Sequence, residues 1–374
     1  MNAQFSIPNS QRMTNDECPK PGRHARGHSG LGIDWSLVIG HWSLRALTIA
    51  LALAAAPLQA AAPVKIRLAT LAPKDTSPHK SLQQMGESWR KSTGDQVQLT
   101  IYTDGTMGGE ADMVRRMRVG QIQAAMLTGP GLSQIEDSVS GLQLLPMMFR
   151  SLDEFDYAFE KLRPGLEKKF RDKGFEVLCW GDLGWVRLFS KQPGRRIDDF
   201  RKMKVFVWSG DSRSADVMRA LRVNPVPAEQ TDVLPGLQTG LFDMVPSVPI
   251  YALAGQFYGP ASHMLEINWV PLVGATIVLK KSWDATPADK RPALLQAAAE
   301  AGKQIRAQGR KESDEAVAAM VKRSLKVIQP TPDDLADWVR FADEAHSKIR
   351  GKLVPAEMFD EVSKLVKEYR AKAK

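Results

Sequence analysis

The chain has 374 residues, 43% of them hydrophobic and 25% charged, and a formal net charge of +9 at pH 7. These proportions are those of an ordinary globule long enough for two domains, and they exclude a disordered or collagen-like chain. The basic excess lies mostly on late helical segments with acidic residues in between, which is typical of solvated helix faces rather than of a nucleic-acid surface.

An export signal is predicted near the amino terminus. Arg45 precedes a short apolar run, and small residues follow it up to Ala62. The run is too short to cross a hydrocarbon layer of ~30 Å, which takes ~20 apolar helical residues. We therefore expect cleavage between Ala60 and Ala62 and a mature protein in the periplasm, without a membrane span. We interpret residues 1–40 as the result of a start site assigned too far upstream, without a function of their own. The alternative is a genuine extended leader.

Apolar periodicity predicts alternating strands and helices along the rest of the chain. As far as residue 127 the order is strand, helix, strand, helix, strand, which predicts parallel strands covered by helices. A second set of the same kind follows from residue 204. The predicted strands are 64–69, 96–102, 122–127, 175–180, 204–208, 223–226, 242–245, 275–279 and 325–328. The predicted helices are 78–90, 111–119, 152–173, 212–221, 232–239, 288–322, 332–349 and 356–373.

Familiar catalytic and metal-binding patterns are missing after the signal. The histidines His79, His263 and His346 stand far apart, and no P-loop, G-x-S-x-G or G-x-G-x-x-G pattern occurs. The acidic pairs at 198–199 and 333–334 are interpreted as helix caps. Cys179 lies in an apolar run and is expected to be buried rather than reactive. We therefore expect a binding protein without cofactor, metal or enzymatic activity, its ligand lying between two lobes at the strand ends.

Five segments in order carry a resemblance to a known family. They are Ile-Arg-Leu-Ala-Thr-Leu-Ala-Pro at 66–73, the run from Thr-Met-Gly-Gly-Glu at 106–126, Leu-Leu-Pro-Met-Met-Phe at 144–149, Asp-Asp-Phe-Arg-Lys-Met-Lys-Val-Phe-Val at 198–207, and 227–243 with its Leu-Gln-Thr-Gly-Leu-Phe-Asp. The chain resembles the extracytoplasmic substrate-binding proteins of tripartite ATP-independent periplasmic (TRAP) transporters, the DctP family, from about residue 64 to 349.

The resemblance implies an α/β fold of two lobes joined by crossing strands and a long helix. It also implies closure on a small molecule and delivery to the small and large TRAP membrane subunits. The expected parts are 1–62 (leader and signal), 63–184 (first lobe), 185–272 (second lobe), 273–312 (return to the first lobe and spanning helix) and 313–374 (return to the second lobe and C-terminal helices).

The chain departs from the family at the expected ligand site. Phe206 stands where an arginine usually clamps a ligand carboxylate, and Ser247 lies near a position where asparagine is often found. We therefore expect a larger, less polar ligand than a dicarboxylate or sialic acid, namely a hydrophobic or monocarboxylic acid. Arg187 matches a second arginine of some members, and a ligand contact and a surface ion pair are both open for it. The candidate ligand-binding residues are Thr70, Glu110, Thr128, Trp180, Trp185, Arg187, Phe206, Trp208, Ser247 and Tyr251.

Each candidate also has a plainer interpretation. Phe206 and Trp208 fit core or interlobe packing equally well, because one face of a strand is buried. For the whole chain the alternatives are a binding protein of an ABC importer, a periplasmic enzyme on the same scaffold with Cys179 as its thiol, and a scaffold protein that lost transport.

Overall fold

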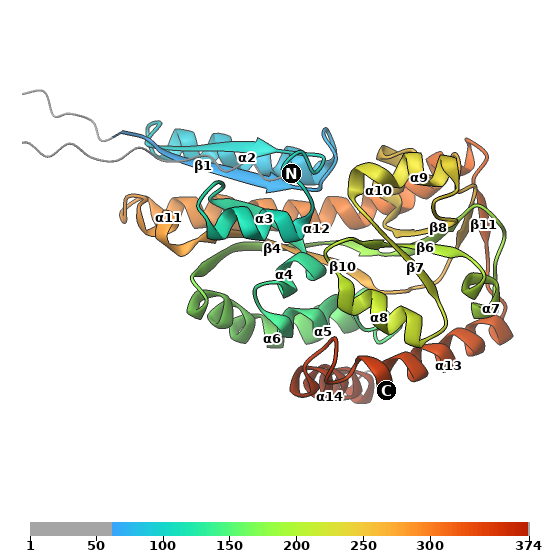
Figure 1. Cartoon of the computed structure of the whole chain (residues 1–374). Helices are drawn as coiled ribbons and strands as arrows, with labels where there is room; N and C mark the ends of the chain where they lie inside the picture. Colours follow the sequence, from blue (N-terminus) through green and yellow to red (C-terminus); the bar gives the residue numbers. More distant parts are fainter. Residues whose placement is uncertain (1–61, 373–374) are drawn as a thin grey trace, which may run out of the picture. The chain divides into compact units, whose positions relative to one another are not determined.

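The structure is a computed structural model that describes residues 62–372, and two mixed sheets organise these residues (Figure 1). The predicted leader and almost all of the signal lie outside the described residues. The first sheet has the order β2 (Val97–Tyr102), β1 (Val64–Thr70), β3 (Ala124–Thr128), β10 (Pro271–Leu279), β4 (Phe175–Trp185). The second has the order β11 (Lys326–Ile328), β9 (His263–Leu265), β5 (Arg187–Ser190), β8 (Met244–Ser247), β6 (Lys204–Trp208), β7 (Asn224–Ala228).

Strand pairing follows the predicted pattern in the first part of the chain. β1 pairs parallel with β2 and with β3, as the strand-helix-strand order predicts. β10 then enters antiparallel between β3 and β4. Residues 275–278 of β10 are buried, because helices cover both faces of the sheet at its centre. The short strands β5 and β9 and their antiparallel pairing are missing from the sequence prediction.

The eight predicted helices lie close to their predicted positions, and the acidic pairs cap two of the observed helices. Asp199 Oδ2 accepts from the backbone N–H of Arg196 at 3.1 Å, and Asp334 Oδ2 accepts from that of Thr331 at 3.0 Å. The helices are α2 (Ser77–Ser92), α3 (Glu110–Arg118), α4 (Gly129–Ser133), η2 (Asp137–Val139), α5 (Ser140–Gln143), α6 (Leu152–Asp172), α7 (Ile197–Arg201), α8 (Ser212–Ala220), η3 (Gln230–Asp232), α9 (Val233–Thr239), α10 (Pro249–Ala254), α11 (Lys280–Asp284), α12 (Arg291–Val321), α13 (Pro332–Ile349) and α14 (Ala356–Lys372). The short helices α4, η2, α5, α7, η3, α10 and α11 were not predicted, and the helices capped by the acidic pairs are α7 and α13. Among residues 62–372, no helix combines the length and apolarity that a bilayer crossing requires.

The chain crosses between the sheets at two adjacent strands. β4 leaves the first sheet at Trp185 and continues as β5 of the second, and the chain returns after β9 into β10. At the crossing, the backbone N–H of Val186 donates to the carbonyl of Val270 at 2.9 Å. The two crossing segments are therefore tied to each other where they pass between the sheets.

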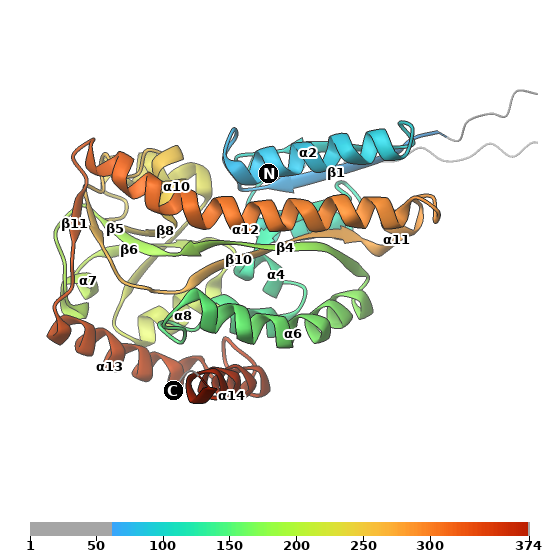
Figure 2. The same cartoon turned by 180° about the vertical axis from the view of Figure 1, so that it is seen from behind.

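Helix α12 makes a third connection. Its 31 residues correspond to a length of about 46 Å at 1.5 Å per residue, and it runs from α2 past β4 to α10 (Figure 2). Gly302 and Gly309 allow its close approach to β4. A Cβ added at Gly302 would lie 2.5 Å from the carbonyl oxygen of Trp180, and one at Gly309 would collide with Leu183. Ser313 Oγ donates to the carbonyl of Leu183 at 2.9 Å.

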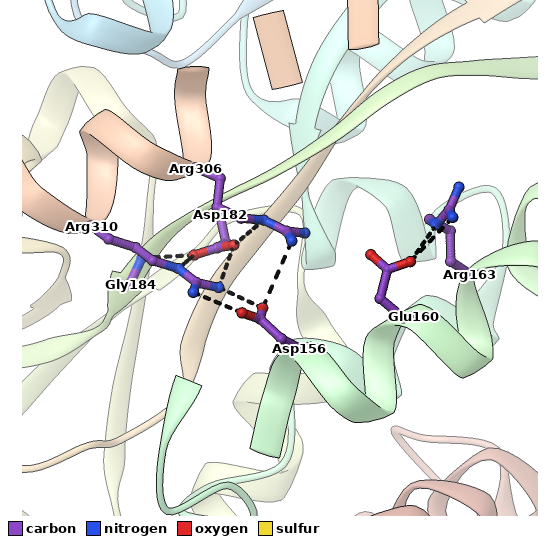
Figure 3. A network of polar contacts seen from close by, with 7 residues as sticks. All are labelled: Asp156, Glu160, Arg163, Asp182, Gly184, Arg306 and Arg310. Carbon is purple, nitrogen blue, oxygen red and sulfur yellow. Dashed lines mark hydrogen bonds and ion pairs between the residues drawn. The ribbon is translucent and has the colours of Figure 1, made fainter. Parts of the chain in front are cut away.

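Four charged side chains lock α12, β4 and α6 together (Figure 3). Asp182 on β4 has a side chain that is 1% exposed. Its carboxylate accepts from Arg310 Nε at 2.7 Å and lies 3.0 Å from Arg306 Nε. Arg310 also holds Asp156 of α6 through two bonds of 2.6 and 2.9 Å. Burial disfavours the charge of Arg310, but these carboxylates outweigh it and raise the pKa of the guanidinium. The cluster has no net charge, which makes its burial tolerable.

The structure also suggests how the parts divide between the lobes. α13 packs on α7 and α8 beside the second sheet, whereas α14 packs on α5 and α6 beside the first (Figures 1 and 2). We propose that residues 63–184 and 273–312 belong to the first lobe and residues 185–272 to the second, and that α14 returns to the first.

The buried carboxylate of this cluster is expected to contribute more to stability than an exposed ion pair. Asp182→Asn leaves Arg306 and Arg310 with too few acceptors, and we expect it to lower the free energy of unfolding by about 3–5 kcal/mol. Glu160→Gln is the matched control, because Glu160 is 54% exposed and pairs with Arg163 on the surface; its expected cost is below about 1 kcal/mol. Urea denaturation of the wild type and the two variants measures both changes in the free energy of unfolding. Equal effects of the two substitutions would contradict the assigned role of Asp182.

Candidate functional site

A cavity of about 160 Å³ lies between the two sheets. We call it the central cavity. The first sheet contributes residues that follow β1 and β3, such as Leu71 and Thr128, and the second contributes side chains of β6 and β8 and of the adjoining helices. The cavity therefore lies where ligands bind in folds of this kind, beyond the strand ends and between lobes.

Phe206 and Trp208 of β6 form an aromatic wall of the central cavity. The rings meet edge to face with centroids 4.9 Å apart, and Phe206 meets Phe242 in the same way at 5.5 Å. Phe206 is only 4% exposed. The two residues share a face of the strand, because alternate residues point the same way. Phe206 is therefore both part of the core and part of the cavity wall.

The lining of the central cavity carries almost no charge. Among the described residues that line it, only Asp211 and Tyr251 are ionisable. Lysine, arginine and histidine are absent from that lining. The carboxylate of Asp211 accepts from the backbone N–H of Ser214 at 3.0 Å and caps α8. Uncharged polar side chains complete the polar part, among them Thr128, Ser247 and Tyr251.

Arg187 lies beside the cavity but not among its lining residues. It pairs with Ser247 across the β5–β8 ladder. Its Nη1 donates to Asn268 Oδ1 at 2.8 Å, and its Nη2 lies 3.9 Å from Glu266 Oε1. Burial lowers the pKa of the guanidinium, and the charge of Glu266 opposes this effect. The side chain thus has partners within the protein.

Two of the candidate tryptophans lie away from the cavity. Trp180 is buried in the core of the first lobe, where its ring meets the edges of Phe159 and Phe170. Its Nε1 donates to Glu167 Oε1 at 3.1 Å. Trp185 is half-buried at the end of β4 and packs against the same core. Neither lines the central cavity.

Glu110 holds the turn between β3 and α4. Its carboxylate accepts from the backbone N–H and the hydroxyl of Thr128, both at 2.7 Å, and from the backbone N–H of Gly131 at 2.9 Å. Burial raises the pKa of this carboxyl, although the three donors oppose the shift. Glu110 therefore fixes the orientation of Thr128 at the cavity.

A smaller cavity of about 50 Å³ adjoins the central one on the side of the first sheet. Thr70, Thr128, Glu110 and Tyr251 line it, and Thr128 and Tyr251 also line the central cavity. Burial raises the pKa of the Tyr251 phenol, and the charge of Glu110 adds to this effect. The phenol therefore stays neutral and can donate a hydrogen bond to a ligand.

Cys179 also lines this smaller cavity, but its thiol is not activated. Burial raises the pKa of the thiol to about 11, as expected for a cysteine in an apolar run. Residues 62–372 contain no group of three or more His, Cys, Asp or Glu side chains arranged to hold a metal ion.

The two lobes meet above the central cavity. Gly109 before α3 lies against the carboxylate of Glu229, and a Cβ added at Gly210 would lie 2.7 Å from Cβ of Ala111. Arg213 of α8 pairs with Asp137 at 2.9 Å. These contacts join residues of the two lobes beside the site.

Sequence reasoning missed several lining residues. Gln143, Met218 and Trp269 line the central cavity from elements far apart in the chain. Trp269 lies in the return segment between β9 and β10, and β9 itself was not predicted. The apolar run at 269–273 signals burial, but only the crossing of the chain places Trp269 at the cavity.

Comparison with known proteins identifies what the chain is similar to. The family model for bacterial extracellular solute-binding proteins, family 7 (DctP), matches residues 68–352. The C4-dicarboxylate-binding periplasmic protein DctP of Rhodobacter capsulatus is 24% identical over 313 residues, which cover 81% of this chain and 92% of the relative. The 2,3-diketo-L-gulonate-binding periplasmic protein YiaO of Escherichia coli K12 is 23% identical over 319 residues, covering 83% and 94%.

Solved structures give the same fold. The sugar acid binding protein DctPAm of Advenella mimigardefordensis, in complex with galactonate, superposes with a TM-score of 0.76 at 17% identity, covering 82% of this chain and 99% of that one. A TRAP periplasmic solute-binding protein of Shewanella oneidensis with bound succinate gives 0.75 at 17% identity, covering 82% and 100%. The predicted two-lobed α/β fold is thereby confirmed.

The buried carboxylate at the site gives a prediction for stability against pH. Because the pKa of Glu110 is raised above its ordinary value of 4.5 in the folded protein, its contribution to stability is greatest below that value and is lost as pH rises through the folded-state pKa. We compare the wild type with Glu110→Gln. The amide of the glutamine cannot accept from all three donors, and we expect the substitution to lower the free energy of unfolding by about 1–3 kcal/mol at low pH. Denaturation is measured between about pH 4 and pH 8, a range that begins near the ordinary pKa of a glutamate. We expect the difference in the free energy of unfolding between the wild type and Glu110→Gln to shrink as pH rises. A difference that grows with pH would contradict the burial argument.

Proposed function

The chain belongs to the DctP family of bacterial extracellular solute-binding proteins, and from that membership and the lining of its central cavity we propose that it captures an organic solute with a largely apolar body and at most one acid group. The family relatives are binding proteins of transport systems, and this supports a TRAP-type solute-binding protein over an ABC-type one, an enzyme or a scaffold. The observation that carries the choice of ligand is the absence of a lysine, arginine or histidine from the lining of the central cavity, within residues 62–372.

The energetic argument compares charged and apolar ligands. Burying an ionised carboxylate without a partner costs several kcal/mol or leads to its protonation. Burying apolar area against Phe206 and Trp208 instead gains about 25 cal/mol per Å². A dicarboxylate, or a sugar acid with many hydroxyls, finds few partners here, whereas an apolar body with one polar end fits the wall and the few hydroxyls.

We propose that Phe206, Trp208 and Tyr251 contact the apolar body, and that the hydroxyls of Ser247 and Thr128 bind the polar end. Thr70 and Glu110 act behind these contacts by shaping the turns. Arg187 is a further candidate for an acid group, since it neighbours Ser247, but its guanidinium must first leave Asn268 and Glu266. We leave Trp180 and Trp185 out of the proposed site, because they pack in the core of the first lobe.

We further propose that the mature protein acts in the periplasm and delivers its solute to the small and large TRAP membrane subunits, without catalysing a reaction. The contacts between Gly109 and Glu229 and between Arg213 and Asp137 join the two lobes over the cavity. They support a closed shape that a membrane partner distinguishes from an open one.

A ligand panel tests the proposed chemistry. Thermal shift and calorimetry on the protein from residue 63 onward compare succinate and galactonate with phenylacetate, hexanoate and hexanol. We expect the apolar compounds to bind and the polar acids to leave the melting temperature unchanged. The affinity for hexanoate is expected to rise as pH falls, because the neutral acid needs no cation.

Two variants locate the contacts. Phe206→Leu is expected to weaken phenylacetate binding by about tenfold, through the lost apolar and aromatic contact. Arg187→Ala serves as the comparison, because its effect reports whether an acid group uses the guanidinium. Tight binding of succinate that persists in Arg187→Ala would overturn the proposal.

A further inference from the structure

A second hollow in the second lobe lies outside the proposed contacts. We call it the apolar chamber. It has a volume of about 150 Å³ and lies among β5, β6, α7, α8 and α13. Only Gln143 and Ser214 of its lining residues are polar. Gln143 Oε1 already accepts from the backbone N–H groups of Gly129 and Val273, each at 3.1 Å. The chamber therefore offers water few partners, and an apolar hollow of this kind favours an apolar guest.

Aromatic rings form the floor of the chamber. Trp338 and Phe341 of α13 meet edge to face with centroids 6.0 Å apart. Phe200 meets Trp338 at 5.2 Å, and Trp269 stacks on Phe341 at 6.2 Å. The indole N–H of Trp338 donates to the carbonyl of Arg195 at 2.7 Å, so the polar edge of that ring is satisfied within the protein. The floor presents apolar ring surface to a guest.

The chamber and the central cavity adjoin. Seven residues line both, among them Leu144, Met218, Pro246 and Trp269. The boundary is made of these residues, and Met218 is the most adaptable of them, because its unbranched thioether side chain has several rotatable bonds. A molecule lodged in the central cavity can therefore extend past Met218 into the chamber.

Close packing is the rule in protein interiors, where voids larger than a water molecule are few. Walls as deeply buried as those of the chamber, with Val205, Phe200 and Trp338 each 1% exposed, ordinarily collapse on one another. A hollow of about 150 Å³ retained among them indicates a space shaped for an occupant.

We propose that the apolar chamber receives the tail of the solute whose polar head lies in the central cavity, and that the ligand is an amphipathic molecule with a long aliphatic chain, such as a fatty acid or alcohol. The inference rests on the proposed function and specifies its ligand class. Phe206 and Trp208 then contact the part of the molecule next to the head, and Trp338 and Phe341 contact its far end.

Chain length is the variable that tests this proposal. Calorimetry with hexanoate, decanoate and myristate, kept below the concentrations at which they form micelles, is expected to show an affinity that rises about fourfold per added methylene until the chamber is full. The corresponding alcohols are expected to follow the same series, because the head meets no cation.

Variants on opposite sides of the chamber alter its size. Val217→Phe fills it from α8, and we expect the ratio of myristate to hexanoate affinity to fall by about tenfold. Phe341→Leu enlarges it from α13 and is expected to move the preferred chain to a greater length, which keeps the test open if the first variant fails to fold. Val317→Phe is the matched control, a half-buried helical valine on α12 outside the lining of the chamber and of the central cavity, and it is expected to preserve the ratio.

The outcomes separate the two proposals. If phenylacetate and hexanoate bind but affinity does not depend on chain length, the apolar chamber is no ligand site, and the proposed function stands. If none of the apolar compounds binds while succinate or galactonate does, the proposed function fails as well. A chain-length series that is unchanged in both Val217→Phe and Phe341→Leu would place the tail elsewhere and overturn the inference.

Discussion

The contact of α12 with β4 is the constraint on which the other features depend. Two glycines bring the helix backbone close to the strand, and two arginines one turn apart on the helix neutralise a carboxylate that is almost completely buried. Neither element tolerates displacement, because a shift would expose an uncompensated charge or close a gap that only glycine permits. The strand that carries Asp182 is also the strand that leaves the first sheet for the second. The contact therefore fixes the position of this strand close to the point where it leaves the first sheet.

The binding cavity follows from this arrangement. Once β4 and β10 cross between the sheets side by side, tied at Val186 and Val270, the ends of β1 and β3 face those of β6 and β8. The space between them is lined by whatever residues those strand ends carry. In this chain they carry aromatic rings, short hydroxyl side chains and aliphatic residues, and the guanidinium of Arg187 is directed to Asn268 and Glu266. The scaffold is that of the family, and the chemistry of the ligand depends on a small number of positions.

Much of the fold could be predicted from the sequence, because strong periodicity determines local structure. The strand at Lys204–Trp208 and the helix at Pro332–Ile349 were predicted to the residue, and the helix of 31 residues was recognised from its alanine-rich composition. The strand His263–Leu265 was missed, because three residues carry too little pattern and its pairing comes from strands distant in the chain. The extension of β4 beyond Trp180 was missed because Gly181 and Gly184 interrupt the apolar alternation.

The candidate site was harder to predict than the fold. Alternation places Phe206 and Trp208 on one face of a strand, and the structure brings both to the cavity with Ser247, Tyr251 and Thr128. The direction of a side chain at the junction of two elements is set by tertiary contacts, which explains why Trp180 lies in the core beside Phe159.

The central claim is that the cavity selects a solute by apolar contact rather than by a cation. Native mass spectrometry of the protein purified from a bacterial periplasm, followed by extraction and identification of what is bound, tests it most directly. The account predicts a neutral or singly acidic compound with an aliphatic or aromatic body, released when the protein is denatured. A dicarboxylate or a polyhydroxylated sugar acid bound at full occupancy would contradict it.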